Sequence, residues 1–225
     1  MDSVFFCLEI LGIIAFSISG ALVAIKAKFD VFGVVVVGVI TAVGGGITRD
    51  IIVGKTPPMI FSNGYLIGAS ALSALLTFIL AYVKRNDFIS IKGKIEIINN
   101  YFDAVGLAVF TVMGVETTLN YGFSQNALLC ISMGVLTGVG GGLMRDIFTG
   151  SPPYIFTKHI YAIASIFGAA LFYLLRLYVH YPAVSTIVGV AVIVVLRVLA
   201  TKYHWKLPKA HIEKKSIQKN KEKKL

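Results

Sequence analysis

Long apolar stretches separated by short polar segments run through most of this 225-residue chain. A helix that crosses a bilayer needs about 20 consecutive, mostly apolar residues, and several stretches approach that length. The stretches are continuous rather than alternating, which excludes a transmembrane β-barrel, whose strands alternate apolar and polar residues. We expect seven transmembrane helices, over residues 4–25, 31–53, 61–83, 101–119, 124–149, 157–179 and 183–200. The pattern therefore predicts an all-α integral membrane protein.

The composition agrees with this fold class. Hydrophobic residues make up 56% of the chain and charged residues 14%, and the mean hydropathy is +0.82. Soluble domains carry about 25% charged residues, so this chain is too apolar to be one. The amino terminus carries Asp2 and Glu9 and lacks the basic start of a cleaved signal peptide, so we expect the first helix to remain in the protein.

Much of the net charge of +10 falls on one side of the predicted membrane topology. Cytoplasmic segments carry an excess of Lys and Arg, which places the carboxyl terminus inside and, with seven spans, the amino terminus outside. The outer connections then hold little besides Lys55. A basic tail directly after a hydrophobic helix favours contact with anionic lipids over binding to nucleic acid. The inner side collects Lys26, Lys28, Lys84, Arg85, Lys92, Lys94, Lys158 and the basic tail.

A glycine-rich motif appears twice, at matching points of two expected helices. The first copy, Thr41–Gly54, reads TAVGGGITRDIIVG, and the second, Thr137–Gly150, reads TGVGGGLMRDIFTG. FSISG at 16–20 corresponds to FTVMG at 110–114, and a Pro-Pro pair follows each motif. Each copy covers three expected helices, so the second copy enters the membrane from the opposite side and the repeat is inverted. The expected parts are a first three-helix repeat (1–83), a polar cytoplasmic connector (84–100), an inverted second three-helix repeat (101–179), a seventh helix (180–201) and a basic cytoplasmic tail (202–225).

The two glycine triplets predict interruptions of the second and fifth helices. Glycine stabilises a helix least and lets the chain leave helical dihedral angles at little cost. In membrane proteins built from inverted repeats, such breaks face one another near the midplane and form the substrate or ion site. Close packing of helices through small residues is the alternative interpretation. The residues concerned are Gly44, Gly45 and Gly46 in the first copy and Gly140, Gly141 and Gly142 in the second.

An Arg-Asp pair follows each triplet inside an apolar stretch. Charged residues within membrane spans form pairs, reach the interface or line a pathway. Adjacent positions of a helix do not face each other, so we expect pairing across the repeats. The expected pairs are Arg49 with Asp146 and Arg145 with Asp50. These four residues are candidates for the electrostatics of a pore or gate, and a structural clasp between the repeats is an equally open interpretation.

Three hydroxyl residues, Ser17, Ser19 and Thr111, are possible pore-lining residues. Hydroxyl groups also bond back to their own helix, which is the more common role. No histidine has a metal-site spacing partner in a plausible span, and no pairing of a nucleophile with a base emerges. We therefore expect no catalytic residue, no metal site, no cofactor and no enzymatic activity.

The doubled GGGxxRDxxxG motif, with its Pro-Pro pairs, resembles the bacterial and archaeal members of the trimeric intracellular cation (TRIC) channel family. The resemblance covers roughly residues 11–200. It implies a bacterial or archaeal cell (inner) membrane protein that forms a homotrimer, with a pore inside each protomer that conducts K⁺ and, less selectively, Na⁺. It also implies that the second and fifth helices are kinked at the glycine triplets and line the pore. The prokaryotic branch shares a domain that has also been linked to glycine transport.

Three functions are consistent with these sequence features. The first is a passive monovalent-cation channel, in which carbonyl groups at the helix breaks, with Asp50 and Asp146 nearby, replace part of the ion's hydration shell. Arginines in a pore oppose cations unless they are neutralised, so this hypothesis requires paired carboxylates. The second is a secondary transporter of a small zwitterion such as glycine, whose carboxylate Arg49 and Arg145 would bind. The third is a structural membrane protein in which the glycines only pack helices.

Overall fold

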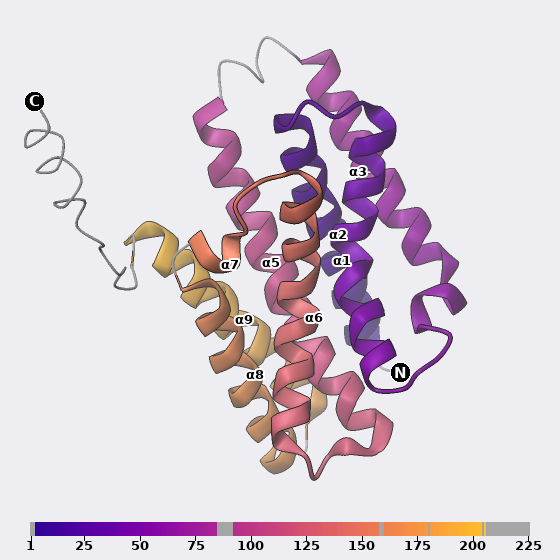
Figure 1. Ribbon diagram of the computed structural model, residues 1–225. Coiled ribbons are helices and arrows are strands. Elements are labelled where there is room, and N and C mark those ends of the chain that lie inside the picture. The colour runs from indigo at the N-terminus through magenta and orange to yellow at the C-terminus, as the bar shows by residue number, and fades with distance from the viewer. Residues whose placement is uncertain (1–2, 85–91, 158–159, 180, 204, 206–225) are drawn as a thin grey trace, which may run out of the picture.

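The computed structural model describes residues 3–84, 92–157, 160–179, 181–203 and 205, with residues 92–94 as backbone alone. The expected basic tail beyond 205, Lys158 and the middle of the expected connector lie outside the described residues. Within the described part there are no strands, and seven helices are long and apolar enough to cross a membrane, which confirms the fold class. They are α1 (Ser3–Lys26), α2 (Val31–Ile52), α3 (Gly64–Val83), α5 (Lys92–Thr118), α6 (Ala127–Phe148), α8 (Tyr161–Tyr178) and α9 (Pro182–Lys202) (Figure 1).

Most helix ends agree with the expectation to within about one turn, and α5 is the exception. It begins at Lys92 instead of 101, so the last part of the expected connector (84–100) is helical. Ile95 and Asn99 lie one turn apart on this segment and are both buried. The polar start of α5 therefore packs against the protein, which hydropathy alone cannot predict. Three short elements complete the part of the fold that the structure describes: η1 (Met59–Ser62), η2 (Leu119–Phe123) and α7 (Tyr154–Thr157).

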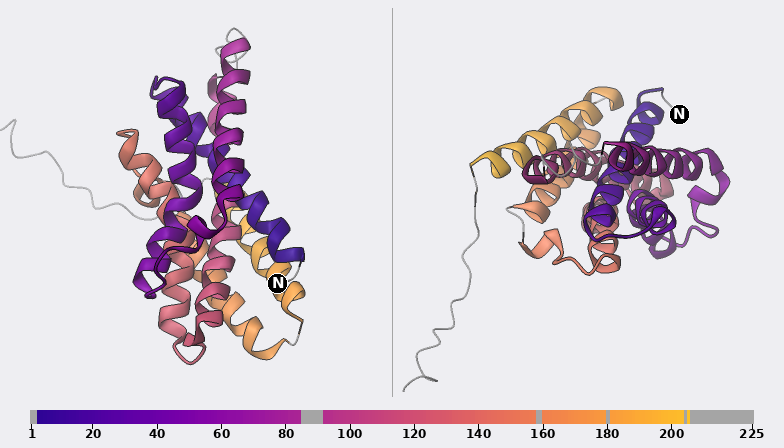
Figure 2. Two further views of the ribbon diagram at one scale, coloured as in Figure 1. Left: turned by 90° about the vertical axis from the view of Figure 1, so that its right-hand side faces the viewer. Right: turned by 90° about the horizontal axis from the view of Figure 1, so that it is seen from above.

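Successive spanning helices run in opposite directions, so that α1 and α5, the first helices of the two repeats, are antiparallel (Figures 1 and 2). The helices α1, α2, α5 and α6 pack against one another in the middle of the bundle. In the first repeat α3 packs on α1 and α2, and in the second repeat α8 packs on α5 and α6 in the same way. The additional helix, α9, packs on α5 and α8.

The two central helices, α2 and α6, meet at the glycine triplets. A Cβ atom on Gly45 would overlap the carbonyl oxygen of Thr137, and a Cβ atom on Gly141 would overlap that of Thr41. Both helices continue without interruption through the triplets, so the expected breaks are absent. The glycines are needed here for their size, because the two backbones approach too closely for a side chain at these positions. The geometry supports the packing interpretation of the triplets.

The same packing recurs around the two central helices. A Cβ atom on Gly20 would lie 2.5 Å from Thr41 Oγ1, and a Cβ atom on Gly114 would lie 2.6 Å from Thr137 Oγ1. Gly20 and Gly114 hold corresponding positions in the two repeats, as do the two threonines. The first helix of each repeat therefore packs closely on the second through the same glycine.

The core between the repeats is built around two phenylalanines. Phe16 and Phe110 occupy corresponding positions, and their ring centroids lie 5.3 Å apart. A Cβ atom on Gly106 would overlap the Phe16 ring, and one on its counterpart Gly12 would lie 3.3 Å from the Phe110 ring. Contact between equivalent residues is expected where a pseudo-two-fold axis passes between two inverted repeats.

Candidate functional site

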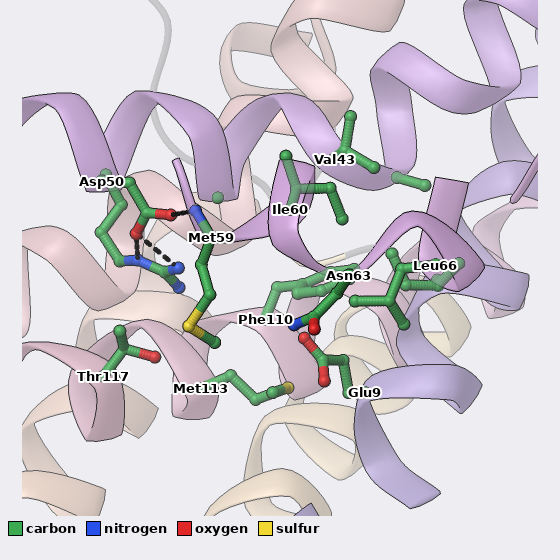
Figure 3. Close-up of a pocket in the computed structure, with 14 residues that line it drawn as sticks. Glu9, Val43, Asp50, Met59, Ile60, Asn63, Leu66, Phe110, Met113 and Thr117 are labelled. Carbon is green, nitrogen blue, oxygen red and sulfur yellow. Dashed lines mark hydrogen bonds and ion pairs between the residues drawn. The ribbon is translucent and has the colours of Figure 1, made fainter. Parts of the chain in front are cut away.

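The arginine and the aspartate of the first repeat's Arg-Asp pair bond each other at the carboxyl-terminal end of α2. Arg49 donates from Nε and Nη2 to Asp50 Oδ1, at 2.9 and 2.8 Å, and both residues are buried. The second carboxylate oxygen of Asp50 accepts the backbone N–H of Met59 at 2.8 Å, from the segment that follows α2. We call Arg49, Asp50 and the contact to Met59 the first clasp (Figure 3).

The second repeat forms the same arrangement at the carboxyl-terminal end of α6. Arg145 Nε donates to Asp146 Oδ1 at 2.8 Å, and Asp146 Oδ2 accepts the backbone N–H of Tyr154 at 2.7 Å. Met59 and Tyr154 occupy corresponding positions in PPMIF and PPYIF. We call Arg145, Asp146 and the contact to Tyr154 the second clasp.

The expected pairs between the repeats, Arg49 with Asp146 and Arg145 with Asp50, are wrong. Each arginine follows the central glycine of its triplet by four residues. We call the point where α2 and α6 meet at their glycine triplets the glycine crossing. Because α2 and α6 are antiparallel, the two clasps lie on opposite sides of this crossing. Each long arginine side chain instead folds along its own helix to the next carboxylate, a reach that the rule for facing helix positions does not describe.

The second clasp has further partners around its arginine. Arg145 is fully buried, and its Nη1 donates to Ser19 Oγ at 2.6 Å and to Asp103 Oδ1 at 2.7 Å. The ring of Tyr154 covers the guanidinium, with the Arg145 Cζ 4.6 Å from the ring centroid. Ser19 Oγ donates to Asn99 Oδ1 at 2.8 Å, and the Asn99 amide donates to the Tyr154 hydroxyl at 3.0 Å. These contacts form a polar network around Arg145, whose Nη2 is buried and has no hydrogen-bond partner among the described residues.

A second arginine approaches the same network from α9, which lies outside the repeats. Arg197 is buried, and its Nη2 lies 3.6 Å from Asp103 Oδ2. Its guanidinium carbon lies 4.6 Å from the centroid of the Tyr161 ring, and the Tyr161 hydroxyl donates to Asp103 Oδ1 at 3.4 Å. Asp103 and Asp146 therefore balance Arg145 and Arg197, which keeps the buried charges of this end neutral.

Of the three hydroxyl residues expected beside a pore, only Ser19 contacts a clasp, through its hydrogen bond with Arg145. Ser17 donates to the Ser70 carbonyl at 2.5 Å and ties α1 to α3. Thr111 Oγ1 lies 2.7 Å from Ser165 Oγ and ties α5 to α8. Ser17 and Thr111 hold corresponding positions, so this tether also recurs in both repeats. Neither residue lines the space beside either clasp, and a pore-lining role for these two stays a prediction without support from the geometry.

Sequence reasoning misses Asp103 and Arg197 as site residues. A signal for Asp103 exists in the repeat, because it stands seven residues before Phe110, as Glu9 stands seven before Phe16. The alignment of the two copies thus places an acid at the same point in both. Arg197 gives only the signal of a basic residue inside an apolar stretch.

Other charged groups lie away from this site. Glu116 accepts from Arg176 Nε at 2.6 Å and from Arg176 Nη2 at 2.9 Å, which ties α5 to α8. In the part of the chain that the structure describes, no group of three or more His, Cys, Asp or Glu could hold a metal ion. Within the described part of the chain, the charged groups near the two clasps are therefore the candidates for functional chemistry along the axis of the bundle.

Each clasp borders a space. A cavity of about 50 Å³, which we call the first cavity, lies beside the first clasp (Figure 3). Its polar lining consists of Glu9, Arg49, Asp50, Asn63 and Thr117. A groove of about 680 Å³ lies beside the second clasp, between the end of α1, the start of α5 and the segment after α6. Its polar lining consists of Lys26, Lys28, Glu96, Asn99, Thr149, Ser151, Tyr154 and Thr157.

Comparison with known proteins identifies the family. The family model described as Glycine transporter matches the chain twice, over residues 6–82 and 100–177. The chain is 35% identical over 205 residues to the inner membrane protein YadS of Escherichia coli (strain K12), which covers 89% of this chain and 93% of YadS.

Solved structures of similar fold agree with this assignment. The TRIC orthologue from Rhodobacter sphaeroides has a TM-score of 0.80 and 30% identity, over 90% of this chain and 100% of that one. A prokaryotic TRIC channel crystallised in 0.5 M KCl has a TM-score of 0.80 and 33% identity, over 92% of this chain and 100% of that one. These relatives are membrane proteins and channels, not enzymes. The chain therefore belongs to the prokaryotic branch of the TRIC family, a family of multi-pass membrane proteins whose sequence domain is described as a glycine transporter.

Proposed function

We propose that the protein is a monovalent-cation channel that favours K⁺ and conducts Na⁺ less selectively, with no cofactor besides the permeant ion. The observation that carries the proposal is a series of polar groups inside one protomer. These groups line the first cavity on one side of the glycine crossing, and form the second clasp and line the groove on the other side. Charged residues buried in membrane proteins are typical of ion pathways. The likeness to structures described as cation channels supports the same function.

The second clasp closes the proposed pathway. Arg145 is fully buried and held by contacts to four neighbouring side chains, so a cation meets a fixed positive charge at this point. Opening requires this guanidinium to leave the axis, which exposes the carboxylate of Asp146 to the ion. Because α2 and α6 are unbroken here, we propose that opening bends them near Gly45 and Gly141, where bending costs little. Carbonyl groups freed by the bend then replace part of the hydration shell.

The assembly and the orientation are parts of the proposal. A homotrimer is supported by the Rhodobacter relative, which is described as trimeric, and the polar series within one chain favours a pore in each protomer. Exposed apolar side chains on α3, α8 and α9 provide surfaces for lipid and for neighbouring protomers.

The basic residues favour an outer amino terminus and a cytoplasmic carboxyl terminus, with anionic lipids near the basic tail. The first cavity then faces the outside and the groove faces the cytoplasm.

A secondary transporter of glycine is the second candidate, because the matching family model carries that description. Alternating access needs a gate on each side of the substrate site, and the two clasps lie on opposite sides of the glycine crossing. Arg49 and Glu9 both line the first cavity and suit the carboxylate and the ammonium group of a zwitterion.

Flux through the purified protein in liposomes separates the two functions. The vesicles carry an outward K⁺ gradient, and K⁺ efflux is measured with and without external glycine, against protein-free liposomes as the control. A channel gives K⁺ efflux that follows the membrane potential and is unaffected by glycine. Saturable glycine accumulation with little K⁺ leak contradicts the channel and establishes the transporter.

A further inference from the structure

Glu9 is a carboxylate within a membrane-spanning helix that no described group of the protein pairs. It lies on α1, is half-buried and lines the first cavity. Among the described residues, no donor hydrogen-bonds to its side chain and no basic group lies within 4.0 Å of it. Arg49 borders the same cavity but directs its donors to Asp50. An ionised carboxylate in a membrane protein is costly unless a positive charge or water compensates it.

The corresponding acid of the second repeat is compensated fully. Asp103 Oδ1 lies 2.7 Å from Arg145 Nη1, and Asp103 Oδ2 lies 3.6 Å from Arg197 Nη2. Two acids face two arginines at that end. At the first cavity, Glu9 and Asp50 share a single arginine among the described residues, which leaves one negative charge in excess.

Further oxygen atoms meet Glu9 at the first cavity. The Asn63 side chain makes no capping hydrogen bond to α3, and Figure 3 shows it and the Glu9 carboxylate pointing toward one another. Thr117 lies across the cavity. The hydroxyl of Tyr121 is buried without a hydrogen-bond partner and lies within electrostatic range of Asp50, at the same end of the bundle. Polar groups without partners thus gather where the charge is unbalanced.

The first cavity has room for an ion. Its volume of about 50 Å³ exceeds the roughly 10–15 Å³ that one water molecule needs by the same measure. An ion can therefore enter together with a few waters and keep part of its hydration shell. One excess negative charge suits a monovalent ion, whereas calcium sites use six to eight oxygen ligands and several carboxylates.

We propose that the first cavity is a binding site for a monovalent cation, K⁺ or Na⁺, held by the Glu9 carboxylate, the Asn63 amide oxygen and water. The choice of ion rests on the proposed channel function. The site deepens that function, because it is the place where an ion from the amino-terminal side of the bundle first loses part of its hydration shell. The second clasp has no equivalent site, since Arg145 and Arg197 already occupy the neighbourhood of Asp103.

Thermal unfolding of the full chain in detergent tests binding without flux. The melting temperature is compared in KCl and in N-methyl-D-glucamine chloride at equal ionic strength. We expect K⁺ to raise the melting temperature of the wild type in a saturable manner. Glu9→Gln should lose most of this rise, and Glu9→Asp should retain part of it. A rise caused by Ca²⁺ and not by K⁺ overturns the monovalent site.

Asp30→Asn is the matched control for the loss of one negative charge. Asp30 is exposed at the start of α2 and accepts the Gly33 N–H at 2.8 Å, a cap that asparagine provides equally well. This variant should keep the full K⁺-dependent rise. In crystals soaked with Tl⁺ as a substitute for K⁺, the anomalous density should show a peak beside Glu9 that Glu9→Gln abolishes.

Flux measurements connect the site to conduction. We expect Glu9→Gln to lower K⁺ efflux about tenfold near 0.01 M salt, where the Debye length is about 30 Å, and much less near 1 M, where it is about 3 Å. Identical melting, Tl⁺ density and efflux in Glu9→Gln and wild type mean that Glu9 carries a proton and overturn the site. A wild type that binds K⁺ through Glu9 but carries no K⁺ flux supports the site and contradicts the channel.

Discussion

The two clasps of this protein share one plan and differ in their surroundings. In both, an arginine bonds the next aspartate, and that aspartate holds a backbone N–H of the following segment at 2.7–2.8 Å. The glycine crossing and the hydroxyl tethers are also shared. Contacts that fix the backbone have therefore been kept in both copies of the repeat.

The side chains that set charge and access have diverged. Ser19, which bonds Arg145, has Met113 as its counterpart, and Tyr154, whose ring covers Arg145, has Met59. Arg197 comes from α9, which has no equivalent among the repeats. The buried charges of one end are thus balanced, whereas the other end carries an excess negative charge. Repeat symmetry therefore predicts the framework of a site better than its electrostatics.

Removal of the two clasp arginines should have unequal effects. We expect Arg145→Gln to cost about 3–5 kcal/mol of unfolding free energy, because it leaves Asp103 and Asp146 buried with too little positive charge. Arg49→Gln should cost about 1–3 kcal/mol, because Asp50 keeps its backbone donor and borders a cavity that admits water. Denaturant unfolding in detergent measures both. Equal losses would remove the distinction between the clasps, and Arg145→Gln with Asp103→Asn should recover part of the loss.

Substitution of the crossing glycines should have equal effects in the two repeats. Gly45→Ala and Gly141→Ala each place a Cβ atom on a backbone carbonyl of the opposite helix. We expect a loss of about 1–3 kcal/mol for each, measured by thermal unfolding. Gly68→Ala is the control, because a Cβ atom there meets nothing within 4 Å and alanine favours the helix by up to about 1 kcal/mol. A large difference between the two crossing variants would show that the crossing is not symmetric.

The smallest effects are expected for the hydroxyl tethers. Ser17→Ala and Thr111→Val each remove one hydrogen bond between the first and third helices of a repeat. Such bonds between membrane helices contribute about 0.6 kcal/mol on average. Both variants should conduct as the wild type does if the tethers serve only packing. A change in K⁺ efflux at unchanged melting temperature would instead support the pore-lining role.

Much of the framework follows from the sequence. The apolar stretches predict the seven spans because the bilayer fixes helix length, and the doubled motif predicts the inverted repeats. The match of FSISG with FTVMG also places Phe16 and Phe110 at equivalent positions, and the structure brings them into contact.

The site is predicted less well, for two physical reasons. Glycine allows either a broken helix or a close approach, and only the position of Thr137 and Thr41 on the partner helix decides for the approach. The carboxylate that each of Arg49 and Arg145 bonds depends on which end of the antiparallel crossing the arginine occupies. Residue spacing on a single helix does not contain that information. Asp103 becomes visible only when the repeat is used as an alignment.

The seventh helix makes the two ends of the molecule inequivalent. Two copies of one unit inserted in opposite senses present the same resistance to ions that arrive from either face. Arg197 on α9 ends that equivalence, because it adds a positive charge beside one end alone. A conductor built in this way is expected to rectify, with a larger current in one direction than in the other at voltages of equal size. Arg197, together with the side chains that differ between the two repeats, is expected to set the sign of that rectification.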